Sequence, residues 1–494
     1  MKEREAKLTA PPGFKLPELG GADDGFLAEV QPPRRYATTY WDTADLRLAR
    51  WGVSLRFREG EGWTLKLPVD ERGPVLVREE HTAAGEQRKV PDELADLVRV
   101  YVRGAELTPV GRLRAVRRPV ALRNAAGDAL AEVVDDEVQV VEGRRIADRF
   151  REVEVELGEA AKPDTMARVL ARLREAGAEE TEPVPKYLRA LNGREIGAPE
   201  LVPGDLAKGA SVEELLRKDL TDGTLRLFRH EAAVRLGEDP EGVHQARVGC
   251  RRLRSTLRTF SSVLEPEWTD RLRTELQWLA DQLGEVRDAD VLLARLEGRL
   301  DELPAVDQAA GRRLLASLAA QRGAARTRLL EAMREPRYTA LLDALVAAAQ
   351  APAVTAEAAR PAVAVMTPLV AGQWKKLRKA VRKAGKEPPD EVLHGIRVKA
   401  KRCRYAAEAV EPVVGRRARD FARAVTGLQD VLGEQHDAVV AEGWLRQAAG
   451  SARRDQALVA GQLVVLERAA AATARQQWRP AWKALSRKSL TSWL

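Results

Sequence analysis

The segment His244-Gln-Ala-Arg247-Val-Gly-Cys-Arg251-Arg252-Leu-Arg254 decides the fold of the C-terminal half, because a second version of it lies 150 residues later. That copy reads His394-Gly-Ile-Arg397-Val-Lys-Ala-Lys401-Arg402-Cys-Arg404. Each copy is followed by a further matched segment, LGEVRDADV from Leu283 and LGEQHDAVV from Leu432. Two motifs repeated in the same order indicate that this half is a duplicated unit.

The basic residues of the first copy fall on one face of a helix. Counted from His244, the cations of this face lie 3, 7, 10 and 14 positions later, at Arg247, Arg251, Arg254 and Arg258. At about 100° per residue these positions span a sector of roughly 80°. No acidic residue interrupts them, although like charges three or four positions apart repel by roughly 0.2–0.5 kcal/mol per pair. Such a face favours a polyanionic partner, and a solvated face of a basic protein is the plainer alternative.

Composition sets the class of protein. The chain has 494 residues, with 82 Lys and Arg against 74 Asp and Glu, which predicts two to four domains of a soluble globular protein. Its two cysteines, Cys250 and Cys403, are too few for a disulfide framework and fit a reducing compartment. Neither a signal peptide nor a run of 18 or more apolar residues is found, so we expect a cytoplasmic protein that does not span a membrane.

The two halves of the chain differ in hydrophobic period. Residues 1 to about 195 alternate polar and apolar side chains, which predicts about eight antiparallel strands with helices near Glu93–Val102 and Met166–Ala176. Residues 196–210 are rich in Pro and Gly and are interpreted as a linker. Residues 211–494 follow a helical pattern, which predicts two bundles at about 211–350 and 360–494. The expected fold class is multidomain α+β, a β-domain followed by duplicated all-α bundles.

Charged residues of one sign share single faces of the predicted strands. Glu152, Glu154 and Glu156 alternate with valines in one late strand, and Arg56 and Arg58 share a face of an early strand. Alternation alone fits a solvated surface. It also fits the lining of a barrel, in which carboxylates would hold Mg²⁺ or Mn²⁺ and cations would hold phosphate oxygens.

An ordered set of seven elements resembles the CYTH family, also called the triphosphate tunnel metalloenzymes. The elements are Glu3-Arg-Glu5-Ala-Lys7, Tyr40-Trp-Asp42-Thr43, Leu55-Arg56-Phe-Arg58, Lys66, Arg78-Glu-Glu80, Glu152-Val-Glu154-Val-Glu156 and Lys186-Tyr187-Leu-Arg189. In the C-terminal half, His244-x-x-Arg247 and His394-x-x-Arg397 resemble the CHAD family, the conserved histidine α-helical domain. Together the two resemblances cover nearly the whole chain.

The first resemblance implies an eight-stranded antiparallel tunnel that binds a triphosphate and hydrolyses it with a divalent metal, Mg²⁺ or Mn²⁺. The implied metal ligands and acidic lining residues are Glu3, Glu5, Glu132, Asp136, Glu152, Glu154 and Glu156. The implied triphosphate-binding residues are Lys7, Arg56, Arg58, Lys66, Arg78, Glu80, Arg114, Arg117 or Arg118, and Lys186. Two registers stay open, Arg117 against Arg118 and Asp135 against Asp136. Val184-Pro185 departs from the family, in which a serine is common before the lysine.

The second resemblance implies that the helical half binds inorganic polyphosphate through its basic stripes. The implied contacts are His244, Arg247, Arg251, Arg252, Arg254, Arg258, Lys375, Arg378, Lys379, Arg382, His394, Arg397, Lys401, Arg402 and Arg404. For the two histidines, a phosphate contact and a buried structural role are both open. His436 stands where the first copy has Arg287, so we expect that position to be peripheral. Asp288 and Asp437 are expected to pair with basic side chains.

The leading interpretation is a metal-dependent inorganic triphosphatase that acts on tripolyphosphate and carries a polyphosphate-binding CHAD domain, in the cytoplasm and at polyphosphate granules. One alternative is a non-catalytic protein that binds or targets polyphosphate. A second is another triphosphate substrate, either thiamine triphosphate or ATP in an adenylate-cyclase-type reaction. Nucleic-acid binding is disfavoured because the chain lacks a recognised reader motif and has only 5% aromatic residues.

Overall fold

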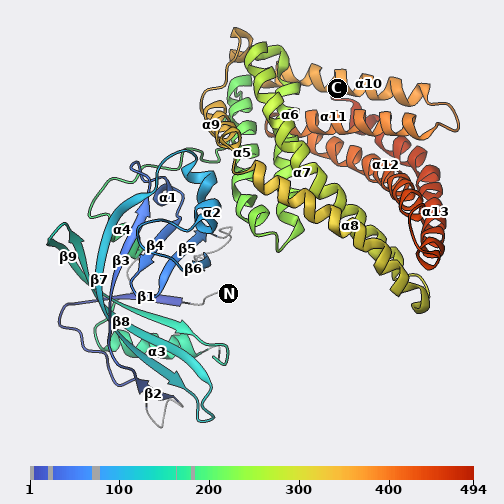
Figure 1. The fold of residues 1–494 in the computed structure, drawn as a ribbon. Coiled ribbons are helices and arrows are strands. Elements are labelled where there is room, and N and C mark those ends of the chain that lie inside the picture. Colours follow the sequence, from blue (N-terminus) through green and yellow to red (C-terminus); the bar gives the residue numbers. More distant parts are fainter. Residues whose placement is uncertain (1–4, 21–25, 69–77, 163, 180–183) are drawn as a thin grey trace. The chain divides into compact units, whose positions relative to one another are not determined.

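The structure is a computed structural model that describes residues 5–20, 26–68, 78–162, 164–179 and 184–494 (Figure 1). The side chains of Glu5 and Arg78 and the whole of Glu3 lie outside this description. The chain divides into two compact units, Met1–Glu200 and Leu201–Leu494. The boundary between them falls within the segment that the sequence predicts as a linker.

Unit 1 is built on one antiparallel sheet. Its strands are β1 (Glu5–Ala10), β2 (Leu27–Val30), β3 (Arg34–Asp42), β4 (Ser54–Arg58), β5 (Gly62–Pro68), β6 (Arg78–Ala83), β7 (Thr108–Arg123), β8 (Ala129–Glu142) and β9 (Arg145–Leu157). Eight of them follow the order β1-β9-β8-β7-β3-β4-β5-β6, and β2 pairs with β7 outside this path. The predicted antiparallel domain of eight strands is confirmed. Closure into a barrel stays a prediction, because no ladder joins β1 to β6 among the described residues.

Four helices accompany the sheet: α1 (Arg47–Arg50), α2 (Asp92–Val102), α3 (Thr165–Glu175) and α4 (Lys186–Ala190). The two helices that the sequence predicts correspond to α2 and α3. Helix α3 covers one face of the sheet, where Val169 and Leu173 join Val153 and Val155 of β9 in a buried core (Figure 1). Because side chains alternate along a strand, the glutamates of β9 must point to the other face. We call this second face the inner face.

Unit 2 is entirely helical in its regular structure and shows the duplication directly. The first set is α5 (Val212–Leu236), α6 (Pro240–Thr259), α7 (Pro266–Leu300), α8 (Ala305–Ala332) and α9 (Pro336–Gln350). The second is α10 (Ala362–Lys383), α11 (Asp390–Val414), α12 (Arg416–Ala449), α13 (Arg454–Leu485) and the short α14 (Lys488–Thr491). Helices α10, α11 and α12 each begin 150 residues after α5, α6 and α7. The repeated motif therefore occupies matching helices, α6 and α11.

The start of α6 is fixed by local capping. The side chain of Asp239 accepts a hydrogen bond from the Glu241 backbone N–H at 2.8 Å, and Pro240 fills the first helical position. Both features are typical of helix N-termini, because the first amides have no partner within the helix. The motif histidine, His244, consequently lies just beyond the first turn of a long helix.

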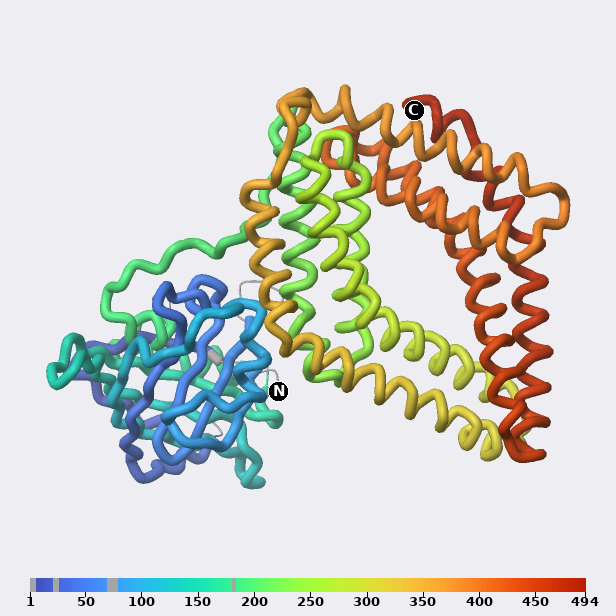
Figure 2. Tube along the Cα trace, turned by 45° about the horizontal axis from the view of Figure 1, so that its top comes forward, coloured from blue at the N-terminus to red at the C-terminus, as the bar shows by residue number. Residues whose placement is uncertain are grey.

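The two helix sets of unit 2 contact each other in two places (Figure 2). At one place α6 packs against α11, and α5 contacts both α10 and α11. At the other place α8 packs against α13, and Leu296, Leu315, Leu445 and Leu463 share a single buried core. The free cysteines, Cys250 on α6 and Cys403 on α11, are both buried, and burial raises the pKa of each thiol to about 12.

Helix α13 is long and apolar enough, by length and composition, to cross a membrane, and it is the one such helix in the described part of the chain. In the structure its Val459, Ala460 and Leu463 pack into the core that the two helix sets share. Core helices of soluble proteins pass the same test of length and composition, so the finding is weak evidence for a membrane span.

Candidate functional site

Strand register brings the charged residues of the inner face into rows. Lys7 of β1 lies opposite Glu154 of β9, and Glu152 of β9 lies opposite Asp136 of β8. Asp136 in turn lies opposite Arg117 of β7. Paired residues in adjacent strands point to the same face of a sheet. The consecutive strands β7, β8 and β9, together with the distant strand β1, therefore contribute acids and bases to one surface.

Lys186 completes this arrangement from outside the sheet. Helix α4 begins at Lys186, directly after Pro185. The Lys186 ammonium contacts three carboxylates. The Lys186 Nζ lies 2.6 Å from Asp136 Oδ2, 3.0 Å from Glu154 Oε1 and 3.5 Å from Glu152 Oε1. We name the resulting group the inner-face cluster, and its members are Lys7, Arg117, Asp136, Glu152, Glu154 and Lys186.

The cluster is densely paired. Lys7 donates to Glu154 at 2.7 Å, and Arg117 donates to both oxygens of Asp136 at 2.9 and 2.7 Å. Arg117 also lies 3.3 Å from Glu154. Planar guanidinium and carboxylate groups form such two-point contacts with fixed geometry. Every cation of the cluster is therefore held by at least one carboxylate.

Burial and pairing shift the ionisation of these groups in opposite directions. Burial opposes charge on Glu154, but Lys186 and Lys7 outweigh it and hold the pKa of that carboxyl well below its usual range. Burial likewise opposes charge on Lys186, yet Glu154 and Asp136 raise its pKa. Glu152 differs, since burial raises its pKa to about 7. Its buried Oε1 has no hydrogen-bond partner among the described residues.

The acidic members fit a hard divalent cation. Mg²⁺ and Mn²⁺ prefer carboxylate oxygens, and Mg²⁺ commonly uses one or two of them together with waters and substrate phosphates. Glu152 offers a buried oxygen that has ion-pair contacts with Lys186 and Lys7 but no hydrogen bond among the described residues, and Glu154 is hydrogen-bonded beside it. Among the described side chains no group of three His, Cys, Asp or Glu is arranged to hold a metal. The backbone of Glu5 lies opposite Glu156, which lies opposite Glu132, so three predicted acids share the next row.

The inner face also carries the predicted cations of β4 and β5. Lys66 lies directly across from Glu80, and their charged groups are 2.7 Å apart. Burial alone would lower the pKa of Arg56. The charges of Tyr40, Glu80 and Glu154 outweigh burial, and the pKa is raised. Glu154 belongs to β9, which is four places from β4 in the sheet order. The sheet therefore curls far enough for Arg56 to interact with the inner-face cluster.

Tyr36 is a site residue that the sequence analysis did not identify. Its hydroxyl lies 3.3 Å from Asp136 Oδ1, and the Arg58 guanidinium lies 4.1 Å from its ring centre. Arg117 lies 5.6 Å from the same ring. A cation over an aromatic face is stabilised by the ring quadrupole. Tyr36 thus contacts both Arg58 and the inner-face cluster. The alternation of Tyr36 with Thr38 and Tyr40 is the sequence pattern that could have predicted its place on the inner face.

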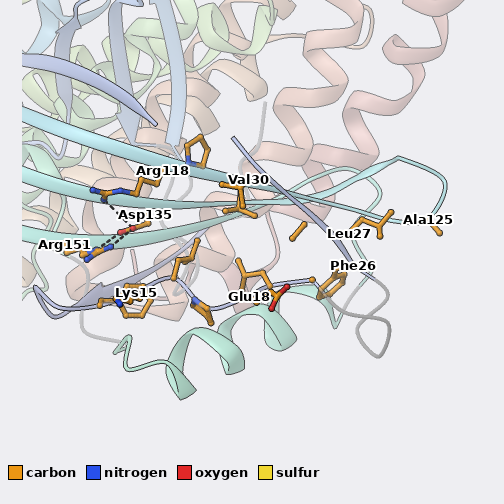
Figure 3. Close-up of a pocket in the computed structure, with 17 residues that line it drawn as sticks. Lys15, Glu18, Phe26, Leu27, Val30, Arg118, Ala125, Asp135 and Arg151 are labelled. Carbon is orange, nitrogen blue, oxygen red and sulfur yellow. Dashed lines mark hydrogen bonds and ion pairs between the residues drawn. The ribbon is translucent and has the colours of Figure 1, made fainter. Parts of the chain in front are cut away.

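Arg114 and Arg118 do not join the inner-face cluster, which corrects their predicted placement. Positions an odd number of residues from Arg117 must point to the opposite face of β7. Arg114 is exposed, and Arg118 pairs with Glu137 at 3.1 Å and Asp135 at 3.7 Å. Figure 3 shows Arg118 and Asp135 on the wall of a separate cavity of about 1060 Å³. Of the two open registers, Arg117 and Asp136 are the residues on the inner face.

Unit 2 holds a second charged site where α6 packs against α11. The Arg251 guanidinium lies 5.7 Å and that of Arg404 4.7 Å from the centre of the Tyr405 ring. The basic stripes of α6 and α11 consequently meet. We name this site the basic junction, and its members are Arg247, Arg251, Arg397, Lys401, Arg404 and Tyr405.

The basic junction is poorly supplied with acceptors. The Nε atoms of Arg251 and Arg397 and the hydroxyl of Tyr405 are buried without a hydrogen-bond partner among the described residues, whereas Arg404 Nε lies 3.3 Å from Glu408 Oε1. Burial lowers the pKa of Lys401 to about 8, and Arg397, Arg251 and Arg247 add to this shift. Asp288 lies 3.2 Å from Arg247 and Asp437 3.9 Å from Arg397, so both predicted pairs are confirmed.

The two motif histidines, His244 and His394, have different neighbours. His394 Nδ1 lies 3.4 Å from His436 Nδ1, with ring centres 4.7 Å apart. His436 is therefore a direct neighbour of the motif histidine, and the expectation that its position is peripheral is wrong. Burial lowers the pKa of His436, and Arg397 and His394 add to this. In the first copy, burial and then Arg287 lower the pKa of His244.

The remaining predicted cations of unit 2 are either paired with polar side chains or exposed to solvent. Arg252 donates to the buried Asp219 at 3.3 Å, and Arg254 donates to Gln277. Glu408 takes the repeat position of Arg258, and it lies 3.3 Å from Arg404. The cations that are exposed to solvent are Arg258, Lys375, Arg378, Lys379, Arg382 and Arg402.

Family comparisons identify one domain in each of the two units. A CYTH domain model matches residues 1–188, and a CHAD domain model matches residues 219–446. An uncharacterized protein of Mycobacterium tuberculosis is 30% identical over 477 residues, which are 90% of this chain and 88% of that protein. The chain belongs to the CYTH–CHAD family. Its members join the two domains in this order along one chain.

Two further similarities concern single domains of this CYTH–CHAD protein. A thiamine-triphosphatase of Macaca fascicularis is 33% identical over 126 residues, which are 25% of this chain and 49% of that enzyme. The crystal structure of the CHAD domain from the plant Ricinus communis has a TM-score of 0.47 at 28% identity, and covers 57% of this chain and 94% of that one.

Proposed function

We propose that the inner-face cluster is the active site of a metal-dependent triphosphatase and that tripolyphosphate is its substrate. The observation that carries this proposal is the convergence of Lys7, Arg117 and Lys186 on Glu152 and Glu154. Three strands and one helix contribute these residues, and the charge of Glu154 also acts on Arg56 of β4. Cations and carboxylates mixed within one site suit a metal–polyphosphate chelate, which carries both signs of charge.

In this proposal the chain's own residues exchange partners when substrate binds. Lys7, Arg117 and Lys186 would turn from carboxylates to phosphate oxygens, which accept the same hydrogen bonds. Glu152 and Glu154, freed of these cations, would hold the divalent metal. The metal would supply charge neutralisation at the leaving phosphate and an activated water. No protein nucleophile is required, because positioning and electrostatic stabilisation account for most phosphoryl-transfer catalysis.

A substrate panel tests this activity. The full-length protein would be assayed for phosphate release from tripolyphosphate, long-chain polyphosphate, ATP and thiamine triphosphate, each with Mg²⁺ and with Mn²⁺. We expect tripolyphosphate to be hydrolysed fastest and chelation of the metal to abolish turnover. Glu154→Gln should remove activity, whereas Arg118→Gln on the opposite face of β7 should not. Equal rates for wild type and Glu154→Gln would refute the proposal.

Preference for thiamine triphosphate is the main alternative for the same cluster, and the partial similarity to a thiamine-triphosphatase favours testing it. An ATP-cyclising reaction is a further alternative. The panel separates them, since release of phosphate from thiamine triphosphate, or formation of a cyclic nucleotide from ATP, would each be seen directly.

We further propose that the basic junction binds inorganic polyphosphate. Its support is the set of buried guanidinium N–H groups without acceptors, together with like charges that repel until an anion joins them. Phosphate contacts of this kind are largely independent of sequence and are sensitive to salt. The proposal includes recruitment of the protein to polyphosphate granules in the cytoplasm.

Binding is measured with full-length protein that carries Glu154→Gln, so that turnover does not consume the ligand. Arg251→Gln combined with Arg397→Gln should weaken binding of long-chain polyphosphate by at least about tenfold and flatten its salt dependence. Arg416→Gln, at an exposed position on α12, is the matched control. Unchanged affinity in the double variant would exclude the basic junction. Stronger competition by RNA than by polyphosphate would favour the nucleic-acid alternative.

A further inference from the structure

Unit 1 contains a cavity on the face of the sheet opposite the inner face, which we call the outer face. Its volume is about 1060 Å³, at the upper end of the range for small-molecule pockets, roughly 300–1,000 Å³. The segment that precedes β2 and β2 itself line one side, and β7, β8 and β9 line the other. The cavity is therefore large enough for a ligand of lipid size.

Most of the lining of this cavity is apolar. Phe14, Leu19 and Phe26 line it from the buried core that α3 covers. Leu27 and Val30 of β2 also line it, although their side chains are 60% and 79% exposed. The cavity consequently opens to solvent beside β2. Apolar side chains exposed together around an opening are typical of ligand-binding grooves.

Charged side chains occupy one end of the cavity, and Phe26 and Leu27 lie at the other end (Figure 3). We name these charged residues the polar end, and its members are Lys15, Arg118, Asp135 and Arg151. The three that lie on strands each adjoin a member of the inner-face cluster in the sequence. Because successive side chains of a strand point to opposite faces, the same strands carry two separate charged groups. Three cations and one acid make the polar end a place for an anion.

The pairing within the polar end leaves two cations accessible. Arg151 donates to both oxygens of the buried Asp135, each at 2.7 Å, and so compensates this acid. Arg118 lies 3.7 Å from Asp135 and 3.1 Å from Glu137, yet 42% of its side chain is exposed. Lys15 is exposed and forms no ion pair within the described part of the chain. An anion in the cavity can therefore contact Lys15 and the exposed part of Arg118.

We propose that this cavity binds one molecule of an aliphatic carboxylate, the chemical class of the fatty-acid anions. The hydrocarbon chain lies against Phe26, Leu27 and Val30, where its removal from water stabilises the complex. The carboxylate accepts charge-assisted hydrogen bonds from Lys15 and Arg118. A cationic amphiphile of the same length would place its charge beside three cations, so the polar end selects for anions.

The test measures binding of dodecanoate to the full-length protein by isothermal titration calorimetry, below the concentration at which the ligand aggregates. We expect one molecule to bind per chain. Affinity should rise by about tenfold for each two CH₂ groups added, from octanoate through decanoate to dodecanoate. Dodecyltrimethylammonium, a cation with the same chain length, should bind at least about tenfold more weakly than dodecanoate because it cannot accept the hydrogen bonds. Tripolyphosphate hydrolysis plays no part in these measurements, so their outcome is independent of the proposed function.

Variants assign the binding to the two ends of the cavity. Lys15→Gln combined with Arg118→Gln should weaken dodecanoate binding by at least about tenfold. Lys89→Gln combined with Arg112→Gln, at two exposed cations outside the cavity lining, is the matched control.

A second pair of variants tests the apolar wall. Val30→Glu places a carboxylate in that wall and should also weaken binding, whereas Val306→Glu, at an exposed valine of α8, should not. All of these positions are at least partly exposed, and urea unfolding checks that each variant keeps its fold. No binding of dodecanoate, no dependence on chain length, or equal affinity in either variant and its control would overturn the proposal. Co-sedimentation with phosphatidylglycerol vesicles in place of binding of the dissolved carboxylate would overturn it as well, because the cavity would then contact membrane lipid.

Discussion

The inner-face cluster and the basic junction both contain several cations, but their surroundings shift the pKa of a lysine in opposite directions. In the inner-face cluster Lys186 touches three carboxylates, and opposite charges raise its pKa. In the basic junction, burial and three arginines lower the pKa of Lys401 to about 8. Two lysines of one chain are thus shifted in opposite directions by the groups around them.

The difference shows what each site needs from its ligand. A paired cation must release its carboxylate before it can bind phosphate. Phosphate binding at the inner-face cluster therefore requires another cation that pairs with the released carboxylates. A divalent metal meets that need. Unpaired cations gain from any anion, because it relieves their mutual repulsion. Dense pairing therefore favours a metal-dependent enzyme site. The basic junction has three ion pairs, but Arg251 and Lys401 have none among the described residues, which favours a polyanion surface.

The largest expected effect comes from breaking the paired site at Arg117. Arg117→Ala removes a two-point partner of Asp136, whose side chain is fully buried. Because Lys186 still contacts Asp136, we expect unit 1 to lose about 3 kcal/mol of unfolding free energy, the low end of the range for a broken buried pair. Arg118→Ala, one residue later on the opposite face, should cost less than about 1 kcal/mol, because its side chain is 42% exposed and Arg151 still pairs with Asp135. Urea unfolding compares them, and similar losses would contradict a difference between the two faces.

Catalysis gives the next largest effect. Lys186→Ala removes the ammonium that links Asp136 and Glu154, and we expect kcat/KM for tripolyphosphate to fall by on the order of 10²–10³-fold, as for other lost electrostatic contacts to a transition state. Lys89→Ala, at a position that is 79% exposed, serves as the control. Phosphate release under saturating metal provides the measurement. A loss of less than tenfold would show that Lys186 does not contact the reacting phosphates.

Adjacent arginines of α6 sharpen the comparison within unit 2. Arg251 has a buried Nε without a partner, whereas Arg252 is paired with the buried Asp219. Arg251→Met should raise the unfolding free energy by about 1 kcal/mol, since it removes an unpaired charge and keeps an apolar stem. Arg252→Met should lower it by about 3 kcal/mol by stranding Asp219. Thermal unfolding at pH 7 distinguishes them, and destabilisation by Arg251→Met would mean that this charge has a partner.

The sequence predicts the repeated helices well because their signal is local and is present twice. The spacing of His244, Arg247 and Arg251 reports helix faces directly, and α2 and α3 follow from periodicity in the same way. The strand alternation similarly predicts that Glu152 and Glu154 share a face. These features depend only on the period of each element.

Contacts between distant elements could not be predicted in this way. Nothing in the spacing of Arg251 or Tyr405 indicates that α6 packs against α11, because that contact depends on the packing of two helix sets. Tyr36 was missed for the same reason, since its partners Asp136 and Arg58 come from β8 and β4. The choice of Arg117 over Arg118 required the pairing register of β7 with β8. Residues such as His436 acquire their role only once these contacts are known.

The smallest expected effect is the pH dependence of polyanion binding at the basic junction. Lys401 has a pKa lowered to about 8, so below that pH it is already protonated and contributes its charge. Above pH 8 it is largely neutral, and a bound anion must draw a proton onto it. Affinity for polyphosphate in wild type should therefore fall by several-fold between pH 8 and about 9.5, with proton uptake on binding.

Lys401→Arg keeps the charge at every pH and should show a flat profile over this range. Guanidinium groups stay protonated in proteins, and His436, with its lowered pKa, loses its proton at lower pH. Isothermal titration calorimetry in buffers of different ionisation enthalpy measures both affinity and proton uptake. A fall of equal size in the arginine variant would assign the titration to another group and would remove Lys401 from the contrast between paired and unpaired lysines.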